Sequence, residues 1–325
     1  MMRQIKNTKY LCNENGSLNE YSIGWGNIPF KDCSINKNIF IKKIWNRYMW
    51  ISKEFILNFS IFDLGYISIL NMSFFDLENF LKVSKKYKYP ISKSIILDDK
   101  INSYVHFKSR NKFINILRSS NYINIDFKWD DMDLNSKVYL DYESLNLVVP
   151  WDYKYFHYTS KHMRLKTQGY LNIESKKYNL DNSNCFIDYG RGVWNRKAEW
   201  EGLITWFKSD KNENISINLV NKYTDNTGLN ENCIKINDKI YKFKSDICFN
   251  YDKNKKLINI KSLKNDEVNL YFKIIEDNNK SHNAIFFRFK EFQKVGIIFG
   301  YIKYKDRYIE VKNTIGWCEK YFAKW

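Results

Sequence analysis

The sequence is poor in the residues that interrupt regular structure. It contains only 3 prolines and 12 glycines in 325 positions, which excludes collagen-like and linker-like compositions. Apolar residues make up 44% of the chain and aromatic residues 18%, so the chain has ample material for a core and does not resemble a disordered protein. At this length we expect one large domain or two ordinary ones.

Long apolar runs are also missing. No stretch approaches the roughly 20 apolar residues that span a bilayer as a helix. The N-terminal segment is positively charged but has no apolar stretch of the kind found in signal peptides. The sequence therefore predicts a cytoplasmic protein with no stable membrane insertion.

Cysteine is scarce and dispersed, and no C-x-x-C pair occurs. Such spacing is typical neither of a metal site nor of a disulfide framework, so we expect buried thiols in a reducing compartment. The cysteines are Cys12, Cys33, Cys185, Cys233, Cys248 and Cys318. His157 and His162 are five apart, which in a strand places them on opposite faces. We expect no metal and no cofactor.

The net charge of +17, from 53 Lys and Arg against 36 Asp and Glu, raises the question of nucleic acid. The lysines, however, are scattered through strand-like segments, and short clusters such as 253–256 are typical of solvated turns. A protein that binds nucleic acid usually gathers its positive charge in a stripe or patch. We therefore expect no nucleic-acid partner.

Alternation of apolar and polar residues recurs along almost the whole chain and predicts strands. In residues 122–129, for example, Ile123, Ile125, Phe127 and Trp129 share one face. A hairpin is expected in residues 301–311, and others around 237–238 and 176–177. Helical spacing is rare: the best candidate is 73–86, with a few more residues near 279–281. Short strands with few helices predict an all-β fold of antiparallel barrels or sandwiches.

Four stretches together resemble the motifs of a known family. They are Leu11–Leu18 followed by Gly24-Trp25 and Pro29; Lys42–Trp45 with Tyr48; Asp188–Trp194; and Ile315–Trp325. Their order and spacing resemble the family described as domain of unknown function 2804. That family is similar to the carotenoid 1,2-hydratase and AttH-like proteins of the lipocalin-like calycin group.

The resemblance implies two antiparallel lipocalin-like β-barrel domains with a few short helices. The first would comprise residues 1–235, including an N-terminal extension, and the second, smaller barrel residues 236–325. A boundary near 155 is the alternative. A barrel could enclose a ligand cavity, or its aromatic residues could simply fill a large core, and composition does not separate these possibilities.

The segment 184–202, NCFIDYGRGVWNRKAEWEG, carries the candidate site. A strand entering a barrel would place Asp188 at or near the lumen, where Arg191 is the nearest cation in sequence and can hold a carboxylate with two bonds. Gly190 and Gly192 would permit a bulge that turns Arg191 back, and Trp194 would supply an apolar wall. The alternative is a structural ion pair between Asp188 and Arg191, with Glu319 or Glu231 as further partners.

The resemblance to the hydratases implies that Asp188, in a D-x-x-x-G context, donates a proton to an alkene, with Arg191 and Glu319 as further catalytic candidates. A direct Arg191–Asp188 pair would oppose proton donation, because a cation favours the charged carboxylate. The candidate ligand-binding residues are Trp45, Tyr48, Tyr189, Trp194, Asn218, Glu231 and Asn232.

Three functions remain open from the sequence. The first is a cytoplasmic double-barrel protein that binds an apolar or aromatic small molecule, such as a lipid or isoprenoid. The second is a metal-free hydratase, cyclase or isomerase that acts on a similar ligand. The third is a structural protein whose barrels are plugged by their own side chains.

Overall fold

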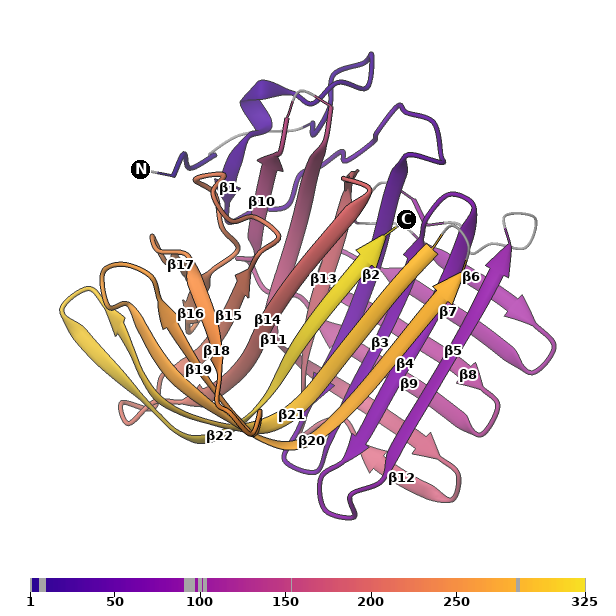
Figure 1. Cartoon of the computed structure of the whole chain (residues 1–325). Coiled ribbons are helices and arrows are strands. Elements are labelled where there is room, and N and C mark those ends of the chain that lie inside the picture. Colours follow the sequence, from indigo (N-terminus) through magenta and orange to yellow (C-terminus); the bar gives the residue numbers. More distant parts are fainter. Residues whose placement is uncertain are drawn as a thin grey trace. The chain divides into compact units, whose positions relative to one another are not determined.

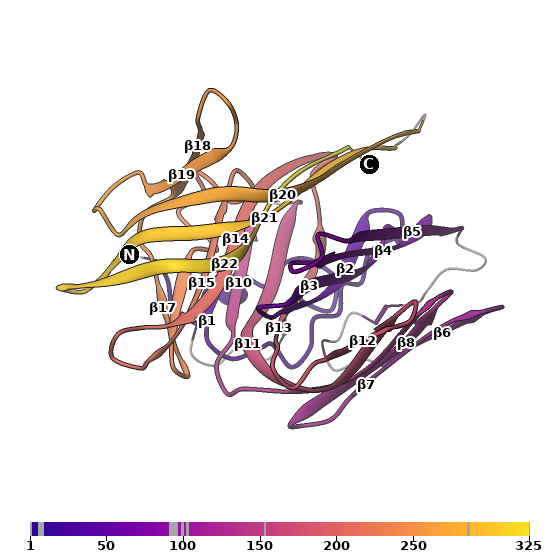
Figure 2. The ribbon, with the colours of Figure 1, turned by 90° about the horizontal axis from the view of Figure 1, so that it is seen from below.

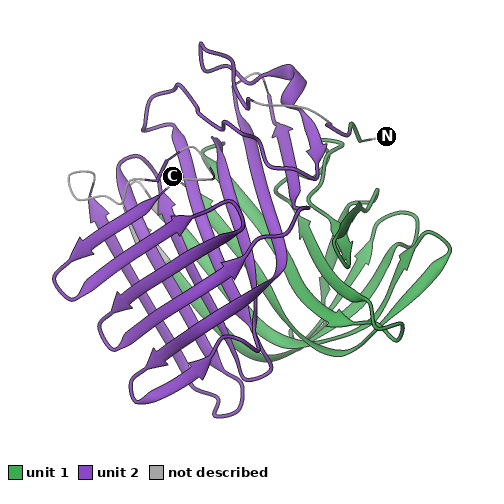
Figure 3. Cartoon of the chain, turned by 180° about the vertical axis from the view of Figure 1, so that it is seen from behind, with its two compact units in different colours: residues 1–3, 195–325 green, residues 4–194 purple. Residues whose placement is uncertain are grey.

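The structure is a computed structural model, and it describes residues 2–5, 10–90, 97–98, 101, 104–152, 154–284 and 287–324. The chain divides into two compact units, coloured in Figure 3: unit 2 is residues 4–194, and unit 1 is residues 1–3 and 195–325. The division falls between Trp194 and Asn195, whereas the domain boundaries expected near 235 or 155 stay predictions. Trp325, the last residue of the fourth motif, lies outside the described residues.

Unit 2 is a curled antiparallel sheet with one short 3₁₀ helix, η1 (Glu20–Ser22). Its strands are β1 (Gly24–Gly26), β2 (Lys42–Ile51), β3 (Phe55–Asp63), β4 (Ile67–Asp76), β5 (Lys82–Pro90), β6 (Val105–Ser109), β7 (Lys112–Arg118), β8 (Tyr122–Trp129), β9 (Met132–Tyr139), β10 (Leu145–Pro150), β11 (Phe156–Ile173), β12 (Lys176–Asn179) and β13 (Asn184–Val193). The order across the sheet is β5-β4-β3-β2-β13-β11-β9-β8-β7-β6, with β10 and β12 also paired to β11 and β1 paired to β10.

The long strand β11 joins the two layers of unit 2. Its first half pairs with β10 and β13, and its second half pairs with β9 and β12. The register shifts between His162 and Leu165, where Arg164 has a positive φ of 56°. Such an irregularity bends a strand, so β11 passes from the layer of β2–β5 to the layer of β6–β9, which Figure 2 shows from below.

The interior of unit 2 is filled by the apolar residues of alternating positions. Ile123, Ile125, Phe127 and Trp129 of β8 are all buried on one face, as the sequence predicted. The Phe59 ring of β3 and the Phe127 ring of β8 lie 4.9 Å apart between centroids. Aromatic side chains from the two layers therefore meet in the middle of the unit.

Unit 1 is a second curled antiparallel sheet. Its strands are β14 (Lys197–Lys208), β15 (Asn214–Asn221), β16 (Cys233–Ile236), β17 (Lys239–Lys242), β18 (Ile247–Tyr251), β19 (Leu257–Ser262), β20 (Val268–Ala284), β21 (Phe287–Tyr304) and β22 (Arg307–Lys324). The order is β17-β16-β15-β14-β22-β21-β20-β19-β18. Each unit thus forms a half-barrel (Figure 1), which confirms the predicted all-β class with two lipocalin-like barrel domains.

The predicted hairpins are confirmed. Tyr304 pairs with Arg307 across a two-residue turn, and Ile236 pairs with Lys239 across Asn237 and Asp238. Ile173 pairs with Lys176 in the same way. In each turn the first residue has a positive φ between 52° and 54°, the conformation that two-residue hairpin turns with the right-handed strand twist require.

The predicted helix over residues 73–86 is wrong. This segment is the end of β4, a turn, and the start of β5, which pairs with β4. The Asp76 carboxylate accepts hydrogen bonds from the backbone N–H groups of Glu78 and Asn79, both at 3.0 Å, and Phe80 has a φ of 55°. An aspartate that bonds its own following backbone favours a turn over a helix. Residues 279–281 lie within strand β20.

Among the residues that the structure describes, none belongs to a helix long and apolar enough to cross a membrane.

Candidate functional site

Strand β13 carries the candidate residues on two different faces. Side chains alternate along a strand, so Asp188 shares one face with Gly190 and Gly192, while Tyr189 and Arg191 point the opposite way. The expected Asp188–Arg191 pair is therefore not formed. The expected bulge is also wrong, because β13 keeps one continuous register with β2 from Asn184 to Val193.

Asp188 instead pairs with residues of β11. The Lys161 ammonium lies 3.2 Å from Asp188 Oδ2, and Thr159 Oγ1 donates to Oδ1 at 2.8 Å. Lys161 is the direct cross-strand partner of Asp188, and their side chains are only 8% and 6% exposed. Both carboxylate oxygens of Asp188 are thus engaged by side chains of β11, an arrangement typical of a structural ion pair.

The two glycines of β13 make room for indole rings. A Cβ at Gly190 would lie 2.5 Å from the ring of Trp45, its cross-strand partner on β2. A Cβ at Gly192 would lie 2.3 Å from the Phe156 carbonyl oxygen and 2.6 Å from Trp194 Nε1. The rings of Trp45 and Trp194 pack with centroids 4.8 Å apart. The lack of side chains at Gly190 and Gly192 therefore leaves room for these two tryptophan rings.

His157 completes this aromatic group. Its ring is 5.5 Å from Trp45, and its Nδ1 accepts a hydrogen bond from Trp194 Nε1 at 3.1 Å. A nitrogen that accepts carries no proton. Burial lowers the pKa of His157 to about 3, so the imidazole is neutral at neutral pH. His162 lies on the other face of β11, beside Tyr189.

The burial of neutral His157 predicts a pH dependence of stability. The unfolded chain protonates this histidine below its ordinary pKa of about 6.5, whereas the folded chain does so only near 3. The unfolded state then binds more protons, so the free energy of unfolding should fall as pH decreases from about 6.5 toward 3. Urea unfolding of wild type and His157→Gln across this range measures it. The contribution of His157 to the slope of the unfolding free energy against pH should vanish in the variant. Equal slopes in wild type and His157→Gln would contradict a neutral His157.

Arg191, Tyr189 and Tyr48 form a separate group on the core side of β13. Arg191 is fully buried, and its guanidinium donates to the backbone carbonyls of Trp45 at 2.7 Å and Gly190 at 2.9 Å. The cation also lies 5.7 Å from the Tyr189 ring. Burial and the neighbouring Tyr189 hydroxyl raise the pKa of Tyr48 well above its usual value. Both tyrosines belong to the packed interior of unit 2.

The remaining predicted residues lie in unit 1. Asn218 Nδ2 donates to the Glu231 carbonyl at 2.8 Å, and Asn232 Oδ1 accepts from the Val220 N–H at 2.6 Å. These side-chain amides thus attach β15 to the segment before β16. Glu319, on β22, accepts a hydrogen bond from Trp317 Nε1 at 2.7 Å. The predicted site residues are therefore divided between the two units.

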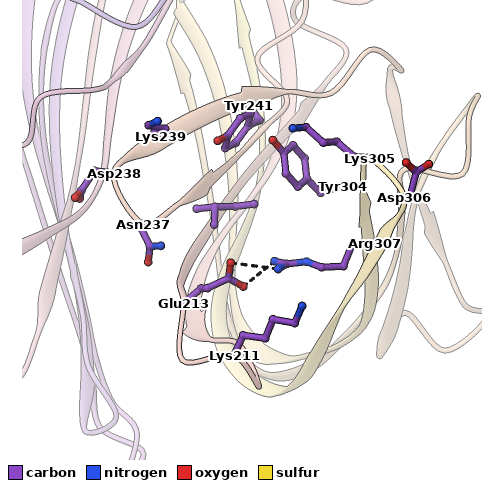
Figure 4. A pocket seen from close by; sticks show the side chains of 11 residues that line it. Lys211, Glu213, Asn237, Asp238, Lys239, Tyr241, Tyr304, Lys305, Asp306 and Arg307 are labelled. Atoms are coloured by element: carbon purple, nitrogen blue, oxygen red, sulfur yellow. Dashed lines mark hydrogen bonds and ion pairs between the residues drawn. The ribbon is translucent and has the colours of Figure 1, made fainter.

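A pocket of about 840 Å³ opens at the turns of unit 1 (Figure 4). Its walls come from three hairpins: the β14–β15, β16–β17 and β21–β22 connections. The lining residues are Lys211, Glu213, Ile236, Asn237, Asp238, Lys239, Tyr241, Tyr304, Lys305, Asp306 and Arg307. The sequence reasoning named none of them as a site. Alternation had located two of these turns, but which turns meet depends on how the sheet curls.

The pocket combines aromatic and charged groups. The rings of Tyr241 and Tyr304 lie side by side with centroids 4.5 Å apart. Both tyrosines and Ile236 pack on the apolar interior of unit 1. Arg307 binds Glu213 with two hydrogen bonds, of 3.2 and 2.7 Å, drawn as dashed lines in Figure 4. A bidentate pair of this kind is geometrically specific and fixes one wall.

A buried acid in unit 1 was also missed. Glu201, on β14, is 1% exposed, and its carboxylate accepts a hydrogen bond from the Tyr251 hydroxyl. Burial raises the pKa of Glu201. A sequence signal existed, because Glu201 is two residues from Leu203 and therefore falls on the apolar face of its strand.

A family model for a domain of unknown function, DUF2804, matches residues 2–325. The chain belongs to the DUF2804 family. No curated protein matches this DUF2804 chain.

Solved structures share the fold of this DUF2804 chain. The crystal structure of the AttH-like protein NE1406 from Nitrosomonas europaea is 8% identical, with a TM-score of 0.53, and the match covers 87% of this chain and 93% of that chain. The crystal structure of CghA with Sch210972 is 9% identical, with a TM-score of 0.53 and coverage of 87% and 88%. At these identities the likeness concerns the fold alone, and it agrees with the resemblance to AttH-like proteins.

Proposed function

We propose that this chain binds a small apolar or aromatic molecule in the pocket of Figure 4. The observation that carries the proposal is the position of the pocket at the turns of a curled sheet, with Ile236, Tyr241 and Tyr304 resting on the apolar interior. Its volume of about 840 Å³ falls in the range of roughly 300–1,000 Å³ for small-molecule sites, which occur preferentially at such places as barrel mouths.

The side chains of the pocket favour a flat apolar ligand with a polar edge. Tyr241 and Tyr304 offer ring faces for stacking together with hydroxyl groups, as amphipathic aromatics do at binding surfaces. Lys211, Lys239 and Lys305 stand at the turns with exposed ammonium groups. A polar or anionic group on the ligand would face these lysines while its apolar part lies against the tyrosines.

The packed interior of unit 2 supports placing the ligand in unit 1. Phe55, Phe74 and Tyr178 pack within 6 Å of one another, in addition to the Phe59–Phe127 contact. Closely packed protein interiors leave few voids larger than water. The third function considered from the sequence, a barrel plugged by its own side chains, thus suits the interior of unit 2.

The alternative of a hydratase, cyclase or isomerase requires an acid that can be neutral at working pH. Asp188 is a poor candidate, because both of its carboxylate oxygens are already engaged by Lys161 and Thr159. We propose that Asp188 is part of a structural ion pair and that any acid chemistry would use another carboxyl group.

Removal of the pocket tyrosines tests the binding proposal. We expect the fluorescent anion 8-anilinonaphthalene-1-sulfonate to bind wild type saturably, since it presents both an aromatic surface and an anionic group. Tyr304→Ala, and more so Tyr241→Ala/Tyr304→Ala, should weaken binding at least about tenfold, the effect of losing ~1.4 kcal/mol of contact. Fluorescence titration gives the dissociation constants.

The matched control is Tyr308→Ala, on the same hairpin. Tyr308 is 56% exposed and does not line the pocket. Its replacement should leave the affinity unchanged. Equal affinity in wild type and in the double tyrosine variant would overturn the assignment of the pocket.

A further inference from the structure

A group of polar side chains, separate from the pocket, lies in the interior of unit 1. It is near the ends of β14 and β15 that lie away from the pocket. The pocket residues Lys211 and Glu213 lie between the end of β14 and the start of β15. Glu201 lies near the start of β14, and Asn221 is the last residue of β15. These two residues are direct cross-strand partners, so their side chains project from the same face of the sheet.

This face is the apolar one. Leu203 and Leu219, each two residues from Glu201 or Asn221, are fully buried in the core of unit 1 and pair with each other across the strands. Glu201 and Asn221 therefore continue an apolar row with two polar side chains. Burial of an acid and an amide at the end of such a row costs free energy unless their hydrogen bonds are satisfied.

Tyr251 reaches this group from the far edge of the sheet. It ends β18, and its hydroxyl donates to Glu201 Oε1 across the interior of the curled sheet. Asn221 is 6% exposed, and its Oδ1 is buried and accepts no hydrogen bond from the residues that the structure describes. Since Tyr251 is half-buried, the group is adjacent to solvent on that side. Asn221 Oδ1 can therefore accept a hydrogen bond from a further group, next to the carboxyl group of its cross-strand partner Glu201.

We propose that Glu201, Asn221 and Tyr251 form a binding site for the hydroxyl group of an otherwise apolar small molecule. The hydroxyl would donate to Asn221 Oδ1 and accept from the protonated Glu201 carboxyl, while Tyr251 holds the other Glu201 oxygen. The alkyl part would extend past the half-buried Tyr251 toward solvent, and its entry would perturb the neighbouring Leu203 and Leu219. The site is independent of the pocket at the turns and can be right or wrong separately from it.

The charges around Glu201 decide its protonation. Burial is the main cause that raises its pKa, and the Tyr251 hydrogen bond and the lysines oppose it. The titratable groups that face the site are Glu199 of the same strand, Lys222 after β15, Tyr251 of β18, Lys294 of β21, and Cys318 and Lys320 of β22. Both lysines also form ion pairs with Glu199: the Nζ atoms of Lys222 and Lys320 lie 2.5 and 3.6 Å from Glu199 Oε1.

The test uses 1-octanol as the probe and the methyl NMR signals of Leu203 and Leu219 in the full chain as the readout. We expect octanol to shift these signals saturably, and n-octane to bind at least tenfold more weakly. For wild type the octanol affinity should fall at least tenfold as pH rises through the Glu201 pKa, because an ionised carboxylate cannot donate. Glu201→Gln stays neutral, so its octanol affinity should not change with pH.

Two variants separate the site from general effects. Glu199→Gln removes the acid that pairs with Lys222 and Lys320, so both lysines lower the Glu201 pKa more strongly; the octanol affinity should still depend on pH but should fall at a lower pH than in wild type. Tyr251→Phe removes a hydrogen bond that lowers the Glu201 pKa, so its affinity should fall at a higher pH than that of wild type. Absence of octanol-induced shifts at every pH, equal binding of octane, or the same pH dependence in Glu201→Gln would each overturn the proposal.

Discussion

Lys161→Met is expected to lower the free energy of unfolding by about 3–5 kcal/mol, the usual cost of leaving one partner of a buried ion pair alone. Of the two described partners of the Asp188 carboxylate, the variant would leave only the Thr159 hydroxyl, and the Asp188 side chain is 6% exposed. Methionine preserves the length and apolar stem of lysine, so the loss reports mainly the missing charge. Urea unfolding followed by tryptophan fluorescence measures the change.

The double variant Lys161→Met/Asp188→Leu tells a structural pair from a functional one. Replacement of a whole buried pair by apolar residues of similar size is often neutral or stabilising, so the double variant should recover more than half of the stability lost by Lys161→Met. Wild-type stability in Lys161→Met would show that the pair contributes nothing. Additive losses in the double variant would show that Asp188 acts through other partners.

The Lys161–Asp188 pair also shows which contacts could not be predicted from the sequence. Alternation predicted the strands, the hairpins and the buried face of residues 122–129, because these depend on neighbours along the chain. The same alternation already placed Asp188 and Arg191, three residues apart, on opposite faces of one strand. The nearest cation in sequence was therefore the wrong partner.

Finding Lys161 needed the pairing of β11 with β13. Lys161 and Asp188 are opposite one another only in this register, and a shift of one residue would send Lys161 to the other face. The pair lies in the register that runs without interruption from Phe156 to His162, and the register shifts only beyond it, between His162 and Leu165. No pattern in the local sequence of either strand predicts that partner. The pocket of unit 1 could not be predicted for a similar reason, because its three turns are far apart in sequence and meet only in the folded sheet.

The failed helix prediction has a different cause. Apolar residues at 74, 75, 80 and 81 imitate one face of a helix, but Phe80 and Leu81 are exposed at 63% and 40%. Asp76 ends the strand by binding the backbone of the turn. A short apolar run cannot be assigned from periodicity alone, and here the turn residue decided the structure.

Gly190→Ala is expected to destabilise the protein by about 1–3 kcal/mol, the usual cost of overpacking a filled site. The new methyl carbon would meet three atoms of the Trp45 indole at 2.5–2.8 Å. Trp45 cannot simply turn aside, because Phe62, His157 and Trp194 pack around its ring. The variant should therefore shift the urea midpoint of unfolding to a lower concentration.

Two comparisons decide whether steric contact with the indole is the cause. Gly202→Ala adds the same methyl group to β14, where the nearest atom would be 3.5 Å away, so its stability should change little. Gly190→Ala/Trp45→Leu replaces the rigid ring by a smaller side chain, so the combined loss should be smaller than the sum of the two single losses. Strict additivity would mean that Gly190 is required for its backbone rather than for the room it gives Trp45. Sub-additivity would instead explain why a glycine precedes Arg191 in the middle of a buried strand.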